Sequence, residues 1–438
     1  MQEHGGKRRR LFNRGRCAAR VLCAAGLFAP LIPAAAEGWE FGGHLKYQFS
    51  FTDYRASDVV AVFGNDPATD QSLDTRLKAE WRQHGWDFVA HDELLALAGD
   101  SVKTRRELAA AGLPSIGSAS GLPNDRHRLL DLTHDVIDDS HAAAVQRLDR
   151  LSVGYTSGNA TLRFGRQVVS WGNGLAFQVL DFVNPFSPLA IDKDYKTGED
   201  MLYGQWQWVG AGDAQWMLLP RRDLLTHDLD HEQASQALKL HTRAAGFDVD
   251  ALLARHFDQT LLGLGLVRSL GGTVWRFDAL HTDVPGRGKV WSLVTNLDYS
   301  WVLFGRNMYG FAEYYHNGFG SARESGYLAD PELLTRLARG EIYAFGRDYA
   351  MLGVQVEIGP LVNVYASVIQ NLNDASRTLQ LRAAYDWRQN TQLMAGINLS
   401  GGESGSEFDG ITAPLPAPYT GVTFSAGRSL YLRTVYSF

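Results

Sequence analysis

Eight basic side chains alternate with apolar residues in the segments that contain them. Successive side chains of an extended strand point to opposite faces, so each cation lies opposite an apolar face. If the apolar faces meet lipid, the cations point into an enclosed lumen, where rings of positive charge favour anions. Acidic residues on the same faces, such as Asp74, Asp87 and Asp386, oppose that preference. The sequence therefore predicts a mild anion preference, carried by Lys46, Arg76, Lys78, Arg82, Arg163, Lys239, Arg243 and Arg382.

A second group of residues lies in the stretch 165–194, which reads as a loop. Pro185 and Pro188 argue against a membrane strand, because proline cannot donate a ladder hydrogen bond. Two interpretations stay open: the stretch folds into the lumen and narrows it, or it packs over the barrel rim. Under the first, the candidate constriction residues are Trp171, Asn184, Pro185, Phe186, Asp192, Lys193 and Asp194.

Motifs of catalysis and cofactor binding are absent from the sequence. We find no G-x-S-x-G, H-E-x-x-H or phosphate-binding G-x-x-x-x-G-K-[ST] pattern, and no C-x-x-C-H for haem attachment. Residues 227–232 combine two imidazoles with three carboxylates, but such a run is more often an exposed acidic loop than a metal site. We predict no catalytic residue, no metal and no cofactor.

The elements that position these residues are alternating segments of about ten residues. One face of the segment 45–52 is Leu, Tyr, Phe and Phe, and the other is Lys, Gln, Ser and Thr. This period of two predicts an all-β protein, and tight turns that alternate with long polar loops favour a closed antiparallel transmembrane β-barrel. We expect about 16 strands (14–18), with the longest external loop at 96–144. A soluble β-sandwich also alternates, but aromatic residues near strand ends, such as Trp86 and Tyr436, favour the barrel.

The two ends of the chain support export. Residues 1–36 combine a basic stretch, a short apolar stretch and Ala34-Ala35-Ala36, which predicts a cleaved signal peptide and a barrel domain over 37–438. Both cysteines lie in that signal, and the mature chain carries a net charge of −12. The last strand ends in Phe438. We expect it to pair with the strand near Leu45 and so to close the barrel.

Part of the loop-like stretch carries a family resemblance. The pattern Gly-Arg-Gln-x-x-Ser-Trp-Gly at 165–172, followed by Asn-Pro-Phe-Ser-Pro at 184–188, resembles porin-like Gram-negative outer-membrane proteins, many of them uncharacterised. The resemblance implies an outer-membrane channel for passive diffusion of small polar or charged solutes. Its expected partners are outer-membrane lipid, lipopolysaccharide and the assembly machinery that reads the strand ending at Phe438, with no nucleic acid. A barrel enzyme (lipase, deacylase or protease) and a barrel for surface-polymer export or assembly stay open as alternatives.

Overall fold

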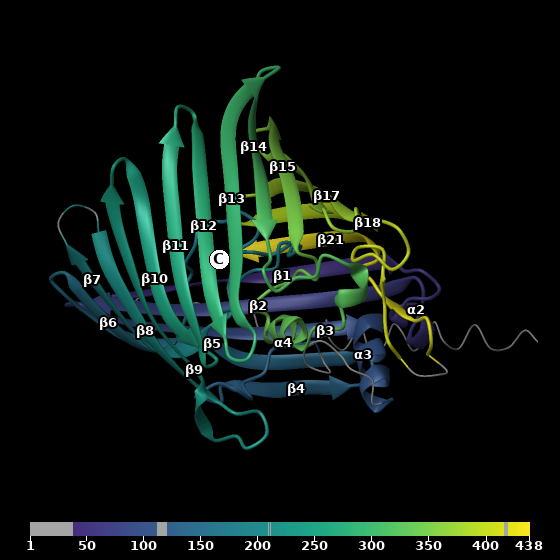
Figure 1. Cartoon of the computed structure of the whole chain (residues 1–438), viewed down its shortest axis with the longest axis horizontal. Helices are drawn as coiled ribbons and strands as arrows, with labels where there is room; N and C mark the ends of the chain where they lie inside the picture. The colour runs from purple at the N-terminus through teal and green to yellow at the C-terminus, as the bar shows by residue number, and fades with distance from the viewer. Residues whose placement is uncertain (1–37, 112–120, 209, 211, 416–418) are drawn as a thin grey trace, which may run out of the picture.

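The computed structural model describes residues 38–111, 121–208, 210, 212–415 and 419–438 (Figure 1). The predicted signal peptide lies outside these residues. The strands are β1 Trp39–Asp53, β2 Ala68–Gln83, β3 Trp86–Gly99, β4 Thr133–Asp139, β5 Ala142–Ser157, β6 Ala160–Gln167, β7 Glu199–Trp208, β8 Gly212–Arg222, β9 Leu229–Ala244, β10 Phe247–His256, β11 Gln259–Leu270, β12 Thr273–Val284, β13 Gly288–Leu303, β14 Arg306–His316, β15 Asp348–Gly359, β16 Val362–Asn371, β17 Arg377–Arg388, β18 Thr391–Gly401, β19 Ile411–Thr412, β20 Thr423–Phe424 and β21 Arg428–Ser437. The helices are α2 Val59–Phe63, α3 Asp100–Ala110, α4 Pro331–Arg339 and the 3₁₀ turn Glu324–Gly326. Among the described residues, no helix is long and apolar enough to cross a membrane.

The carboxyl-terminal strand closes the barrel, as predicted. Strand β21 pairs antiparallel with β18 on one side and with β1 on the other, where Leu45 lies opposite Tyr436. Beyond the strand, the backbone of Phe438 exchanges two hydrogen bonds with Gly43, at 2.8 and 3.1 Å. These contacts leave neither β1 nor β21 with an open edge. Their backbone N–H and C=O groups therefore have hydrogen-bond partners, which hydrocarbon could not supply.

The strand count is a correction to the sequence prediction of about 16. Within the described residues, 18 strands form the closed sheet, and β4 pairs with β5 outside it. The extra strands carry a weak alternating pattern. Strand β8 contains Pro220 at a register shift between Leu219 and Arg221, where no ladder hydrogen bond is required from it. The predicted loop 96–144 is also shorter than expected, because β3 runs to Gly99 and β5 begins at Ala142.

The barrel has two unlike ends. Tight turns at 84–85, 158–159, 245–246, 271–272 and 304–305 lie at one end, called here the turn end. The longest connections, 54–67, 100–141, 168–198, 317–347 and 402–427, start from the opposite end, called the loop end, where the helices gather (Figure 1). Short turns face the periplasm and long loops the exterior in barrels of this class. The predicted alternation of tight turns with long loops holds for much of the barrel, with short connections also at 257–258 and 285–287 of the loop end.

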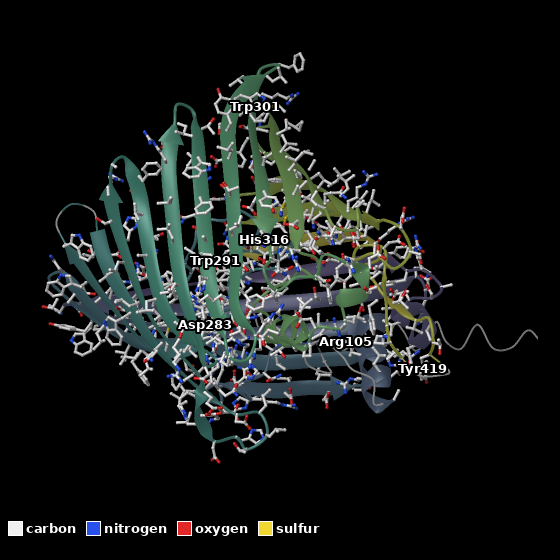
Figure 2. The ribbon with its side chains drawn as sticks, viewed as in Figure 1. Arg105, Asp283, Trp291, Trp301, His316 and Tyr419 are labelled. Carbon is white, nitrogen blue, oxygen red and sulfur yellow. The ribbon has the colours of Figure 1, made fainter. Side chains whose placement is uncertain are left out.

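The outer face of the barrel is an apolar band with aromatic residues at its borders. Trp291 is 56% exposed near the loop end of β13, and Trp301 lies ten residues further along the same strand, toward the turn end (Figure 2). Ten residues of a strand tilted by about 40° rise roughly 25 Å, the height of the apolar band in outer-membrane barrels. Trp86 and Tyr155 pair at 4.8 Å at the turn end. An apolar exterior around a charged interior excludes the soluble sandwich.

Candidate functional site: the inward segment

The connection between β6 and β7, residues 168–198, folds into the barrel and is called here the inward segment. Its apolar side chains, among them Trp171, Leu180 and Phe182, are almost fully buried. They pack in one core with residues of the barrel wall such as Leu219 and Leu261. The inward segment thus covers the apolar side chains on the inner face of the wall, and this part of the lumen is filled with protein.

The first half of the inward segment is held on β12 and β14 by two carboxylates. Asp278 accepts hydrogen bonds from the backbone and side-chain nitrogens of Asn173, at 2.6 and 2.7 Å. Glu313 accepts three backbone N–H groups, from Leu175 at 2.6 Å, Ala176 at 3.1 Å and Phe177 at 2.8 Å. Both carboxylates are buried. A carboxylate that satisfies successive N–H groups fixes a segment that has no helix or strand of its own.

The second half crosses to the opposite wall. Lys46 of β1 binds Asp192 at 2.6 Å and Asp194 at 2.8 Å, and Arg433 of β21 also binds Asp192. Lys78 of β2 contacts the hydroxyl of Tyr195. Because β12 and β14 hold one half and β1, β2 and β21 the other, the inward segment spans the lumen.

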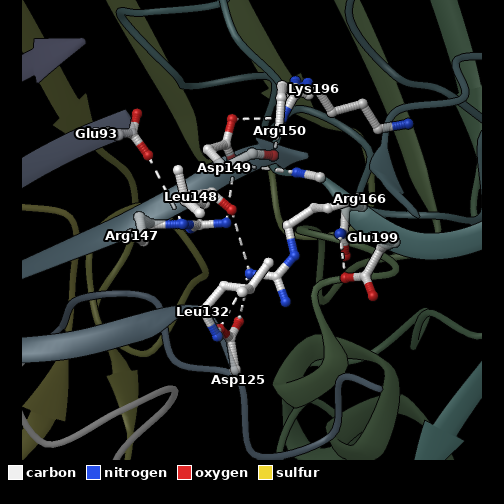
Figure 3. Close-up of polar contacts among 12 residues, drawn as sticks. Glu93, Asp125, Leu132, Arg147, Leu148, Asp149, Arg150, Arg166, Lys196 and Glu199 are labelled. Atoms are coloured by element: carbon white, nitrogen blue, oxygen red, sulfur yellow. Dashed lines mark hydrogen bonds and ion pairs between the residues drawn. The ribbon is translucent and has the colours of Figure 1, made fainter. Parts of the chain in front are cut away.

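Buried polar contacts hold both ends of the inward segment (Figure 3). Arg166, the last but one residue of β6, binds Asp200 of β7 at 2.8 Å and Asp125 at 3.0 Å. At the other end, Arg150 of β5 donates a hydrogen bond to the backbone oxygen of Lys196. The Lys196 side chain pairs with Asp181 and donates to the backbone oxygen of Val169 at 2.6 Å, so it ties parts of the segment to each other. In a poorly solvated site such pairs are stable only when every charge has a partner, so the geometry of the network is strongly specified.

The eight predicted pore-lining cations do not form one group. Lys46, Lys78 and Arg382 contact the inward segment, the last through the backbone oxygen of Ile191 at 3.4 Å. Arg76 is fully buried between Glu93 and Asp149. The other four each bind a nearby carboxylate: Arg82 with Glu80, Arg163 with Asp87, Lys239 with Asp250 and Arg243 with Asp248.

The seven predicted constriction residues also separate into two sets. Trp171 and Pro185 are buried in the core, Phe186 is half-buried, and Asn184 donates to Glu199 at 2.6 Å. In contrast, Lys193 and Asp194 are exposed, and Asp192 is partly exposed. The sequence did not distinguish these sets, because an aromatic residue that fills a lumen and one that borders an opening have the same pattern.

Open space lies beside the second half of the inward segment. On the turn side, a cavity of about 390 Å³ is bordered by Lys193, Arg382, Tyr309 and Tyr365, and a neighbouring cavity of about 180 Å³ shares Arg382 and Tyr365 with it. On the loop side, a cavity of about 160 Å³ lies against β1, β2 and β3. Asp192 and Arg433 border both the loop-side cavity and the smaller turn-side one. The charged pair therefore lies between the two sides.

The loop end is tied together by a buried carboxylate. Glu407, in the connection before β21, accepts hydrogen bonds from Asn371 at 2.7 Å and from the backbone of Phe345 at 2.9 Å, and it contacts the Tyr349 hydroxyl. Burial raises the pKa of the Glu407 carboxyl to about 7. When residues 403–410 are docked on the barrel, Glu407 therefore keeps its proton at pH values where a solvated glutamate, with an ordinary pKa of about 4.3, would have lost it.

Docking of residues 403–410 is expected to weaken as pH rises. The folded pKa lies above the unfolded value, so docking is strongest below about pH 4 and loses stability, up to about 3 kcal/mol, by pH 7 to 8. Amide hydrogen-exchange protection in 403–410 should be lower at pH 8 than at pH 5. Glu407→Gln should remove the difference, whereas Glu403→Gln, at an exposed position of the same loop, should keep it. Equal protection at both pH values in the unmodified protein contradicts this assignment.

One arrangement resembling a hydrolase site is assembled across strands and has no motif in the sequence. Ser235 Oγ lies 2.6 Å from His256 Nδ1, and His256 Nε2 lies 3.5 Å from Glu341. Ser235 and His256 are each 1% exposed, and Arg221 donates to the same serine oxygen at 2.6 Å. A nucleophile must reach its substrate. Ser235 is enclosed by protein, so we assign this cluster a structural role.

Comparison with known proteins shows the fold. No protein-family profile matches the chain, and no curated protein matches its sequence. Among solved structures, OccAB2 of Acinetobacter baumannii is 10% identical with a TM-score of 0.52, over 92% of this chain and 98% of that one. A BenF-like porin from Pseudomonas fluorescens Pf-5 is 9% identical with a TM-score of 0.51, over 92% and 100%. OccK2 (OpdF) of Pseudomonas aeruginosa, solved in complex with glucuronate, is 9% identical with a TM-score of 0.50, over 92% and 98%.

These structures are outer-membrane porins of Gram-negative bacteria, and they match over nearly their whole length. The predicted porin-like architecture is therefore confirmed. A closed barrel with an apolar outer band and this fold is an outer-membrane protein. At about 10% identity the likeness extends to the fold and not to a solute.

Proposed function

We propose that the protein is a non-enzymatic channel through which small polar or charged solutes diffuse across the outer membrane, with a mild preference for anions. The observation that carries this proposal is the pair of cavity regions that meet at Asp192 and Arg433. The apolar core of the inward segment fills the side of the lumen toward β8–β15. The path for a solute then follows the walls β15–β18, β21 and β1–β3, where the cavities lie.

The charges along this path support the anion preference. Arg382 and Lys193 border the larger turn-side cavity, and neither has a carboxylate within ion-pair distance among the described residues. Asp194 is the acidic residue of that cavity, and it is bound to Lys46. Unpaired cations in a narrow passage attract anions more than paired ones, because a partner cancels most of their field. Tyr309 and Tyr365 add hydroxyl groups for polar solutes.

The proposal is tested by reconstituting the protein in planar bilayers and measuring reversal potentials in a potassium chloride gradient. We expect stable open channels whose reversal potential indicates a modest excess of chloride over potassium permeability. Glucuronate, the solute in one of the similar structures, is a suitable first anion for block or transport. A clear cation preference would overturn the selectivity. Absence of any channel, together with esterase or protease activity, would favour the enzyme.

The remaining partners stay predictions from the sequence. They are the assembly machinery that would read the strand ending at Phe438 and the lipopolysaccharide around the external loops. The oligomeric state is not part of the proposal, because a single barrel already encloses the complete path described above.

A further inference from the structure

A shallow basic groove lies on the outside of the barrel at its loop end. It has a volume of about 300 Å³ and is bordered by Arg287, Lys289, Trp291, His316 and Arg347, which define what we call the outer groove. Trp291 and His316 come from the neighbouring strands β13 and β14, and Figure 2 shows both labelled side chains in this region. The outer groove shares no residue with the cavities inside the lumen.

The charged side chains that line the outer groove are all basic, with three carboxylates in the surrounding residues. Among the described residues, none of its lining side chains is a carboxylate. Lys289 and Arg347 are exposed and form no ion pair within 4 Å, although Asp283 faces Lys289 across the strands. Arg287 is bound to Asp330 at 2.8 Å, and His316 to Asp348 at 2.7 Å.

Within the described part of the chain, Lys289 and Arg347 are thus left without an ion-pair partner, although Arg347 Nε donates a hydrogen bond to the backbone oxygen of Gly320 at 3.3 Å. They lie beside Arg287, which Asp330 binds. Such an arrangement costs free energy through mutual repulsion unless an anion occupies the space between the side chains. A solvated groove tolerates the repulsion, but it also presents a ready site for a strong anion.

The position of the outer groove selects the kind of anion. Lys289 lies two residues from Trp291 on β13, so both point to the lipid-facing side. Trp291 belongs to the aromatic border of the apolar band, the depth at which lipid headgroups begin. The groove therefore faces the headgroup layer of the outer leaflet.

We propose that the outer groove binds a phosphate of a lipopolysaccharide headgroup, with Arg287, Lys289 and Arg347 as its ligands and Trp291 against the first carbons of an acyl chain. Arginine binds phosphate through two parallel N–H groups, and lysine binds it as a point charge. The site is independent of the channel path. Its presence would orient the rim of β13 and β14 in the outer leaflet.

The test uses the full-length protein, purified in detergent free of lipopolysaccharide and titrated with diphosphoryl lipid A under native mass spectrometry. We expect one tightly bound lipid A per barrel. The variant R287Q/K289Q/R347Q should bind it on the order of a hundredfold more weakly, because each basic side chain near an anionic headgroup contributes about a factor of five. The control R268Q/R306Q/R388Q removes the same charge at the turn end and should bind as the unmodified protein does.

Three outcomes would overturn the proposal. They are equal affinity of both triple variants, equal binding of dephosphorylated lipid A, and competition by inorganic phosphate as effective as that by lipid A, which would indicate a site for free anions. The single variant Lys289→Gln guards against misfolding, because the exposed Lys289 side chain has no ion pair to lose. It should weaken lipid A binding by roughly fivefold and leave single-channel conductance unchanged.

Discussion

Replacing Glu313 by alanine is expected to raise the single-channel conductance severalfold and to make the open current noisy. Glu313 accepts the backbone N–H groups of Leu175, Ala176 and Phe177 and a further hydrogen bond from Asn296 at 3.1 Å. Removing a buried charged acceptor leaves these donors unsatisfied, at a cost of roughly 3 kcal/mol or more. The inward segment should then leave the β14 wall for part of the time and open the lumen beside it.

Planar-bilayer recordings of Glu313→Ala and of Glu357→Ala provide a matched comparison. Glu357 is also a wall glutamate, but it lies near the turn end and accepts one hydrogen bond, from Asn307 at 2.8 Å. Glu357→Ala should have the same conductance as the unmodified protein within experimental error. A folded Glu313→Ala protein with unmodified conductance and noise would mean that the inward segment is held by its apolar core alone, or that it does not limit the current.

The barrel itself was predictable from local pattern. Alternation of side chains, tight turns and the strand ending at Phe438 are properties of neighbouring residues, and each follows from the geometry of an extended chain next to lipid. The observed 18 strands lie at the upper limit of the predicted 14–18, and the central value of 16 was too low because packing weakens the alternation in some strands. In β7, Glu199 and Asp200 are buried charges of the ion-pair network. The first residues of β7 therefore lack the alternating pattern that predicts a membrane strand.

The candidate site was predictable only in part. Pro185 and Pro188 correctly excluded a strand at the inward segment, and Asp192 and Lys193 lie beside open space. Glu313 and Asp278 were missed, since each meets the inward segment across more than a hundred residues of chain. A lone acidic residue on an inner strand face gives no signal of what it will bind. Likewise, the basic residues were predicted to face the lumen, but their carboxylate partners come from strand pairing and decide which cations stay free.

Arg166→Met is expected to destabilise the folded barrel by about 3–5 kcal/mol, the usual cost of breaking a buried ion pair from one side. The side chain is fully buried and binds Asp200, Asp125 and the backbone oxygen of Leu130, the last at 2.7 Å. Burial raises the pKa of Asp125, but the charges of Arg166 and Arg128 outweigh it and hold the pKa at about 2. Without Arg166 the two carboxylates repel each other at neutral pH.

Urea denaturation in phospholipid vesicles, followed by tryptophan fluorescence, measures this loss. The matched control is Arg163→Met, three residues earlier on β6, whose partly exposed side chain binds one carboxylate, Asp87 at 3.0 Å, and should cost less than about 1 kcal/mol. The loss of unfolding free energy caused by Arg166→Met should be smaller at pH 4 than at pH 7. An unpaired carboxylate takes up a proton at that pH, whereas a carboxylate paired with arginine stays ionised. A deficit equal to that of Arg163→Met would show that the network is dispensable. In that case the apolar core, and not the ion pairs at its two ends, holds the inward segment in the lumen.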